Sequence, residues 1–554
     1  MQLNVLVDPR WKITRNIKIW IALLIATVLV ANYIYVHFIV PAPFFISTDP
    51  EMQYMSSSLA IFKGQPYTYI DHPGTPVELI GTALLALTYP AVNLAHQPFV
   101  LFHLQHPELF MMLVRGFLTV TSILAVLLLL RYAIPGKAPM DVLAAAGIAI
   151  SFYALYPLAA DSLVHWSHND FSFPFGTALL LVVFVMFRNP GRLTKINTIL
   201  LGLAFGFLVA SQLYFVTWIF GAVVGFIVLW VLKARTRAQT LQAIGYTLAS
   251  TVIGFVLFTL PILGSYRRLI SWIYVLTFHQ GKYGGGEFGI TSPATFLENF
   301  KTVIGFGPLL FIAIVVTLVA LMLLAIAQRS KLRENAYLWA AACGFSAQLL
   351  VTLFLIFKQP ANAYLLAVDA IMPLLLTILF TLIGKSTRLA CIARSVVTLI
   401  LVVAFFVNFS MFWTDHSNRV QAIANEDKGI QQFLSNYAAS TGRPVGDLSI
   451  VWSLPTSSRC FAYWFGSLAS LTTNGIFAPE ISQLCPNQWA YIGREIVTLD
   501  GTKTLKQLRW DVMIVSQTAL VRWPQLVNYG KRIDGQSGIV FFLANNPKSV
   551  PLTF

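Results

Sequence analysis

The sequence predicts an α-helical polytopic membrane protein with a small extracytoplasmic α/β domain at its C-terminal end. The chain has 554 residues, of which 57% are hydrophobic and 11% charged, and its mean hydropathy is +0.72. Soluble domains carry about a quarter charged residues, so the composition excludes a string of soluble domains. Four cysteines are too few for a disulfide-dense secreted scaffold. The net charge of +15 is attributed to membrane topology and not to nucleic-acid binding.

Apolar stretches long enough to cross about 30 Å of hydrocarbon recur along residues 1–414. They number eleven and cover 17–40, 109–130, 141–160, 171–187, 196–212, 214–232, 240–263, 302–327, 335–357, 361–384 and 395–413. The stretch 196–232 is divided near Ser211 and Gln212 because it is too long for one span. The apolar stretch 77–94 is interpreted as an interfacial or re-entrant helix, because a span there would move every later basic loop outside.

The positions of the basic residues predict the orientation. Eighteen Lys and Arg side chains precede the first span or lie in alternate loops, and most acids of 1–414 lie in the opposite loops. Cytoplasmic loops of membrane proteins carry an excess of Lys and Arg. We therefore expect a cytoplasmic N-terminus, an extracytoplasmic C-terminus, and a multi-pass protein of the plasma (inner) membrane whose chemistry lies on the non-cytoplasmic side.

The composition changes after residue 414, which predicts two domains, 1–414 and 415–554. The second contains a helix-like stretch, 419–439, and three runs typical of strands, 449–452, 512–515 and 538–543. Outside the cytoplasm, Cys460 and Cys485 could form a disulfide or remain two buried thiols.

The first outer loop, 41–107, contains a strong helix-start signal. Asp49 precedes Pro50 and Glu51, which is the order of a cap, a first-turn proline and a first-turn acid, and Gly64 is expected to end the helix. Asp49 could serve only as the cap. A cap is also rigid and ionised, so the same residue suits a general base.

These residues resemble the GT-C superfamily of polyprenyl-phosphate-sugar-dependent glycosyltransferases, in particular its protein O-mannosyltransferase and lipid A aminoarabinose transferase branches. The matching positions are Asp49, Glu51, Tyr54, Gly64, Tyr67 and His72-Pro73. Three features depart from the family pattern: Pro50 separates the two acids, Gly74 replaces a second proline, and no Lys follows His72.

The resemblance implies a function and a set of site residues. It implies transfer of a sugar from a polyprenyl-phosphate donor to a glycan, lipid or protein acceptor beside membrane lipids, with inversion at the anomeric carbon. Asp49 would be the base, Glu51 a second catalytic acid, and Tyr54, Tyr67 and His72 would bind substrate. It implies no nucleic-acid partner.

A second polar cluster lies between the third and fourth predicted spans. Asp161, His165, His168 and Asp170 follow one another at helical spacings, so one helical face could present two or three ligands to Mg²⁺ or Mn²⁺. Asp170 also resembles the second acid of several GT-C enzymes, which implies a catalytic role. The simpler interpretation is that Asp170 caps the fourth span and the histidines belong to the interface, with no metal cofactor.

Outer basic residues are the candidates for binding the donor phosphate. Arg115 lies within the second span, where a cation is functional by default unless it pairs with Glu108 or reaches the interface. Lys282 with Tyr283 belongs to the outer loop after the seventh span. Lys358 with Tyr364 lies at the outer start of the tenth span. We favour these cations over a metal, because capping explains the acidic cluster.

Two other classes of protein remain open from the sequence alone. A transporter would concentrate charges and broken helices near the bilayer midplane, whereas the acids here lie at outer helix ends. A ligase-like enzyme that acts on lipid-linked glycans would share both the donor lipid and the outer site.

Overall fold

The structure, a computed structural model, divides into two compact units. It describes residues 9–65, 74–132, 139–280, 284–290, 293–383, 388–453, 458–468, 477–492, 495–499, 501–535 and 538–544. The helical unit comprises Met1–Ile34, Ile70–Pro76 and Arg115–Trp413, and the mixed unit comprises Tyr35–Tyr69, Val77–Val114 and Thr414–Phe554.

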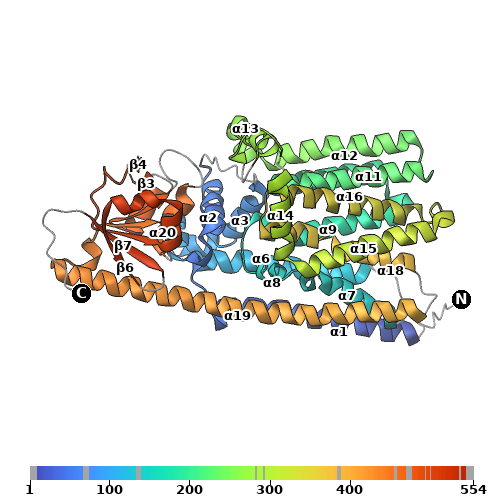
Figure 1. Cartoon of the computed structure of the whole chain (residues 1–554), viewed down its shortest axis with the longest axis horizontal. Helices are drawn as coiled ribbons and strands as arrows, with labels where there is room; N and C mark the ends of the chain where they lie inside the picture. Colours follow the sequence, from blue (N-terminus) through green and yellow to red (C-terminus); the bar gives the residue numbers. More distant parts are fainter. Residues whose placement is uncertain are drawn as a thin grey trace. The chain divides into compact units, whose positions relative to one another are not determined.

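Each of the eleven predicted spans falls in a helix (Figure 1). These helices are α1 (Pro9–Ile34), α6 (Pro107–Tyr132), α7 (Pro139–Ala154), α9 (His168–Arg188), α10 (Lys195–Ser211), α11 (Val216–Val231), α12 (Arg237–Phe258), α15 (Pro308–Ala327), α16 (Ala336–Lys358), the pair α17 (Leu365–Asp369) and α18 (Met372–Ile383), and α19 (Arg388–Thr441). Nine helical stretches among the described residues are long and apolar enough to cross a membrane, and α7 and α10 are shorter, at 16 and 17 residues. The chain is an integral membrane protein.

Close packing of the helical unit depends on small residues. A Cβ on Gly206 of α10 would lie 2.5 Å from the carbonyl oxygen of Thr251 on α12, and one on Gly254 would lie 2.7 Å from the carbonyl of Leu203. A Cβ on Gly344 of α16 would lie 2.7 Å from the carbonyl of Gly221 on α11. Small residues let membrane helices approach closely, where lipid supplies no hydrophobic drive for association.

Shorter helices connect the spans of this unit. They are α8 (Leu158–Asp161), α13 (Tyr266–Phe278) and α14 (Pro293–Phe306), with single 3-10 turns at Leu213–Phe215 and Asn362–Tyr364. The eighth span begins at Pro308 and not at residue 302, because Gly307 and Pro308 end α14 and begin α15.

The first outer loop folds as short helices within the mixed unit. They are a 3-10 turn, Phe44–Ser47, followed by α2 (Thr48–Phe62), α3 (Thr75–Ala86), α4 (Tyr89–Leu94) and α5 (Phe99–Gln105). The apolar stretch 77–94 therefore forms two helices of 12 and 6 residues. Neither is long enough to span about 30 Å of hydrocarbon, which needs about 20 residues.

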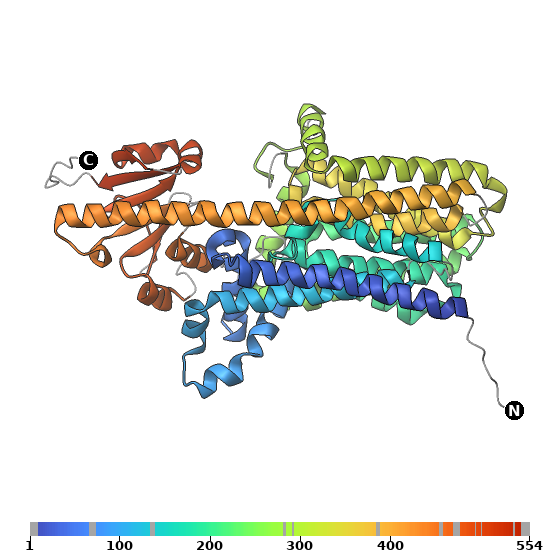
Figure 2. The same ribbon diagram turned by 90° about the horizontal axis from the view of Figure 1, so that it is seen from below.

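The last span and the helix that follows it are one element. The predicted segments 395–413 and 419–439 join in α19, which has 54 residues and contains no proline (Figure 2). Gly442, with φ of +66°, ends it in the left-handed conformation that favours glycine.

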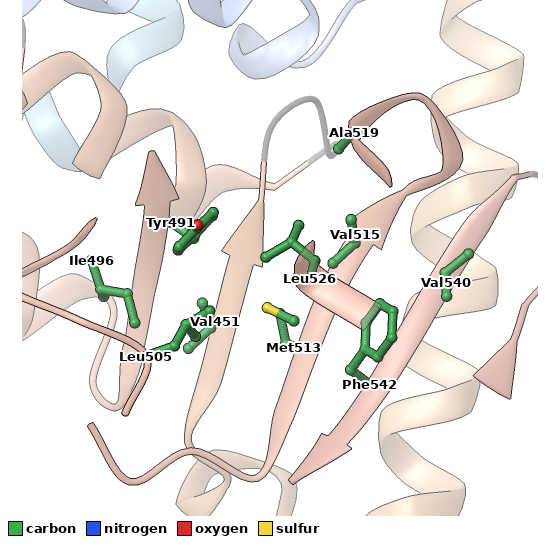
Figure 3. Close-up of a cluster of buried hydrophobic side chains, with 10 residues drawn as sticks. All are labelled: Val451, Tyr491, Ile496, Leu505, Met513, Val515, Ala519, Leu526, Val540 and Phe542. Atoms are coloured by element: carbon green, nitrogen blue, oxygen red, sulfur yellow. The ribbon is translucent and has the colours of Figure 1, made fainter. Parts of the chain in front are cut away.

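The C-terminal segment contains a seven-stranded mixed sheet in the order β4-β3-β2-β1-β5-β7-β6. The strands are β1 (Ile450–Ser453), β2 (Gln488–Ile492), β3 (Glu495–Thr498), β4 (Gly501–Lys503), β5 (Val512–Ser516), β6 (Gly530–Asp534) and β7 (Ile539–Ala544). β1 pairs in parallel with β2 and with β5, and the other pairs are antiparallel. Val451, Met513 and Phe542 belong to the apolar cluster over one face (Figure 3). The three predicted strands are confirmed as β1, β5 and β7.

Two helices and a disulfide connect β1 to β2. α20 (Arg459–Leu468) and α21 (Ala478–Leu484) lie between these strands in the sequence. Cys460, in the first turn of α20, is bonded to Cys485, which directly follows α21. Of the two alternatives left by the sequence, the structure contains the disulfide.

Removing this disulfide should destabilise the mixed unit. It closes a loop with a sequence separation of 25 residues, for which the chain-entropy model gives a stabilisation of about 3 kcal/mol. We expect Cys460→Ala/Cys485→Ala to lower the thermal unfolding midpoint of the purified protein, with Cys343→Ala, a free cysteine, as the control. An unchanged midpoint in the double variant would contradict a stabilising bond.

Candidate functional site

The acid predicted as the base lies at the start of α2. The helix begins at Thr48, so Asp49 is its second residue and not the residue that precedes it, as the cap signal predicted. The Asp49 side chain lies outside the described part of the structure. Glu51 and Tyr54 follow on the same helix and are fully buried. Gly64 has φ of +63°, and the Gly64 N–H donates to the carbonyl of Ile61, which confirms the predicted end of the helix.

Helix α3 packs against α2 through hydroxyl groups. Ser58 on α2 donates to the carbonyl of Glu78 on α3 at 3.1 Å, and Thr82 on α3 donates back to the carbonyl of Ser58 at 3.0 Å. A Cβ on Gly81 would lie 2.4 Å from the Ser58 hydroxyl oxygen. The two helices are therefore in close contact, and each hydroxyl is satisfied across the interface.

Helix α20 of the C-terminal segment also packs against α2. A Cβ on Gly466 would lie 2.7 Å from the carbonyl oxygen of Met52 and 2.9 Å from the hydroxyl oxygen of Ser56. Gly466 is thus one of the positions where only glycine lets two helices approach. The C-terminal segment and the acid-bearing helix form one packed body within the mixed unit.

Arg459 and Tyr463 of α20 also contact residues just before α2 and at the end of α5. The Arg459 guanidinium donates to the carbonyl of Gln105 at 2.7 Å and to the Tyr463 hydroxyl at 2.8 Å. It also lies 5.6 Å from the ring centroid of Phe44, just before α2. The Tyr463 hydroxyl donates to the carbonyl of Leu104. Burial raises the pKa of Tyr463 to about 12, so this donor keeps its proton at neutral pH.

In the helical unit, Asp170 lies in the first turn of α9. The cap is Ser167 and not Asp170: the Ser167 hydroxyl oxygen accepts from the backbone N–H groups of Asn169 and Asp170, at 3.2 and 3.3 Å, and the hydroxyl donates to the Asp170 carboxylate. The Ser167 hydroxyl thus caps the start of α9 and also binds the Asp170 carboxylate. Asp170 is 8% exposed, so a neighbouring molecule can reach it only from one side.

Breaks in neighbouring helices bring more polar groups to Asp170. Gln212, fully buried between α10 and α11, donates to the Asn169 side-chain oxygen at 2.6 Å. The rings of Tyr214 and Tyr364 meet edge to face at 5.6 Å, and the turn that carries Tyr364 contacts α9. The structure therefore brings two predicted residues, Asp170 and Tyr364, near three that the sequence analysis did not select as site residues: Asn169, Gln212 and Tyr214.

The predicted metal-binding face does not form. Asp161 ends α8 and lies 3.1 Å from the His165 ring, whereas His168 and Asp170 belong to α9. The expectation of one continuous helical face over 161–170 was wrong, because Ser167 starts a new helix. Among the residues that the structure describes, no group of three His, Cys, Asp or Glu side chains could hold a metal ion. We therefore derive no chemical step through a metal.

Lys358 has a clear structural partner. It is the last residue of α16, and its ammonium group donates to the carbonyls of Leu276 and Thr277, each at 2.6 Å, at the end of α13. A cation there satisfies orphan carbonyls and complements the helix dipole. On the other side, Asn299 of α14 donates to the carbonyl of Phe357 at 2.9 Å. The end of α16 thus anchors both short helices.

The remaining predicted residues are placed as follows. Arg115 is 3% exposed within α6. Tyr67, His72, Lys282 and Tyr283 lie outside the described residues. Their roles stay predictions.

Asp369 is a further acid that the sequence analysis treated only as a polar contact within the bundle. It is fully buried at the end of α17, and neither carboxylate oxygen has a hydrogen-bond partner among the described residues. Pro373, four residues later, explains the helix break, because proline clashes with the carbonyl four residues before it.

The whole chain is similar to a solved membrane protein. The crystal structure of ArnT from Cupriavidus metallidurans bound to undecaprenyl phosphate matches with a TM-score of 0.51 over 96% of this chain and 99% of that chain, at 11% identity. The chain has the fold of ArnT. At 11% identity this likeness concerns the fold alone. No family model and no curated protein matches the sequence.

The contact between Lys358 and α13 generates a prediction. Hydrogen bonds to a charged group are worth about 1.5–3 kcal/mol, so Lys358→Met should accelerate amide exchange in 266–278 about tenfold or more in the purified protein. Lys301→Met, an exposed lysine on α14, serves as the control and should leave exchange in that segment unchanged. Equal exchange in both variants would show that the Lys358 contact does not anchor α13.

Proposed function

We propose that this chain is an integral-membrane glycosyltransferase that moves a sugar from a polyprenyl-phosphate donor to an acceptor on the non-cytoplasmic face. The observation that carries the proposal is the ArnT fold over 96% of the chain, together with an acid at the start of the first outer helix, where the family resemblance requires one. ArnT was crystallised bound to undecaprenyl phosphate, and we extend a polyprenyl carrier to this chain.

The proposed reaction is a single displacement with Asp49 as the general base. The acceptor oxygen attacks the anomeric carbon while its proton passes to the Asp49 carboxylate, and the bond from that carbon to the phosphate oxygen breaks. Polyprenyl phosphate leaves with the electron pair, and the configuration is inverted. A base held on a helix that is packed on two sides is suitable, because proton transfer requires positioning to within hydrogen-bond reach.

The departing phosphate needs positive charge or hydrogen-bond donors. We propose that Arg115, Lys282 and Lys358 supply it. Lys358 is the least available of the three, since two of its three N–H donors bind carbonyls of α13. Asp170 and Tyr364 would then contact the acceptor or the sugar.

Loss of the base should abolish transfer without unfolding the protein. We expect Asp49→Asn to reduce the turnover of lipid-linked donor to background, because the amide cannot accept the proton, while binding of undecaprenyl phosphate and the thermal midpoint stay near wild type. Asp427→Asn, an exposed acid on α19, is the matched control. Near-native turnover in Asp49→Asn would eliminate Asp49 as the base.

A chelator separates the two accounts of the leaving group. If cations stabilise the phosphate, EDTA leaves the rate unchanged and neutralising the responsible residue, by Arg115→Ala, Lys282→Ala or Lys358→Ala, lowers it about 10²- to 10³-fold. Full sensitivity to EDTA, restored by Mg²⁺ or Mn²⁺, together with wild-type rates in all three variants, would overturn this account and make Asp170 a metal ligand.

A further inference from the structure

A cavity of about 320 Å³ lies at the far end of α2, within the mixed unit. Its walls include Phe62 and Lys63 from the end of α2, Tyr89 and Asn93 from α4, and Gln97 and Phe99 from the entry to α5. The volume is at the lower end of the range for small-molecule sites, about 300–1,000 Å³. It suits a sugar ring or a disaccharide.

The walls are held in place before any ligand binds. The rings of Phe62 and Phe99 stack at 4.3 Å, and Tyr89 lies 5.7 Å from Phe99. Thr88, just before α4, is hydrogen-bonded to the His103 ring on α5 at 2.9 Å. His96 has φ of +53°, and the Gln97 N–H donates to the carbonyl of Val92, which closes the end of α4 and positions Gln97.

The chemistry of the lining fits a carbohydrate. Tyr89 is 46% exposed and offers a ring face, and the C–H face of a pyranose packs on such a surface. The amides of Asn93 and Gln97 each present a donor and an acceptor, which match the donor and acceptor character of vicinal hydroxyls. Lys63 is the one charged residue among the lining residues. His103 nearby is neutral at pH 7, because burial lowers its pKa to about 4. The positive charge of the cavity lining therefore comes from Lys63.

Helix α2 sets the distance between this cavity and the base. Asp49 and Phe62 lie in the same unbroken helix, Thr48–Phe62, and thirteen residues at 1.5 Å each separate them by about 20 Å. A sugar in the cavity therefore cannot be the sugar that accepts the new bond. It must belong to the same acceptor several residues away.

We propose that this cavity is a distal subsite for an oligosaccharide acceptor with an acidic substituent, held about 20 Å from Asp49 by the rigid α2 helix. The inference rests on the proposed glycosyltransferase function and names its acceptor class. Binding energy from such a remote part of a substrate can position the reacting hydroxyl at the base.

Direct binding by the full chain in detergent tests the proposal without using transfer. The probes are hexagalacturonate, maltohexaose and monomeric galacturonate. We expect hexagalacturonate to bind most tightly. Tyr89→Ala and Asn93→Ala should each weaken both hexamers at least tenfold, and Lys63→Met should weaken only the acidic one. Leu94→Ala, a 79% exposed neighbour on α4 outside the cavity lining, is the matched control and should bind normally.

The outcomes separate this proposal from the glycosyltransferase function. Hexamer binding that persists in Asp49→Asn and is lost in Tyr89→Ala supports the subsite even where transfer is absent. Absence of hexamer binding, or binding unchanged in Tyr89→Ala and Asn93→Ala, overturns it. Native mass spectrometry that finds a phospholipid bound to wild type and lost in Lys63→Met would also overturn it, because the cavity would then hold a lipid headgroup.

Discussion

The main constraint on this protein is that no water is available in the hydrocarbon region to satisfy backbone groups, so each span must be a regular helix. Polar side chains of the helical unit therefore lie together where helices are interrupted. Ser167 starts α9, Gln212 separates α10 from α11, and Tyr364 precedes α17. These interruptions bring Gln212 into contact with Asn169, next to Asp170, although Gln212 lies in a stretch of sequence that is otherwise almost entirely apolar.

In the mixed unit, the helix that carries the predicted acid, α2, is held by close packing against its neighbours. Here close contact is achieved by glycine and hydroxyl groups: Gly81 and Ser58 on the side of α3, and Gly466 on the side of α20. The sheet behind α20, stabilised further by the disulfide, keeps that helix in place. Segments about 400 residues apart in the sequence thus hold α2 from Met52 to Ser58, and a fixed helix would position the acid near its start, as the proposed general base requires.

Local rules explain what the sequence could predict. The hydropathy of a span is added over all of its residues, so single exceptions matter little and each of the eleven predicted spans falls in helical structure. The start and end signals around Asp49 and Gly64 predicted α2. The metal-binding face over 161–170 was wrong because spacing alone did not reveal the new helix at Ser167, although the Ser-x-x-Asp pattern was present. Gln212 and Asn169 are hydrogen-bonded although they lie 43 positions apart in the sequence. Patterns of neighbouring residues cannot predict a contact over that separation. The sequence offered one sign of this site, which is that Gln212, an uncharged polar residue, lies inside a 37-residue apolar stretch.

The buried acid in the tenth span has a consequence for how the protein is assembled in the membrane. An acid at a helix centre opposes insertion by about 2.5–3.5 kcal/mol on translocon scales, and Asp369 lies inside this span at the end of α17, just before the break that Pro373 explains. The same span, Asn362–Ile383, has 89% of its most apolar window buried in protein, compared with 22% for the first span. It therefore makes little contact with lipid in the finished bundle. The helices that cover it, α7, α9, α15 and α16, all precede it in the sequence, so the ribosome has made every one of these partners before the buried acid is synthesised.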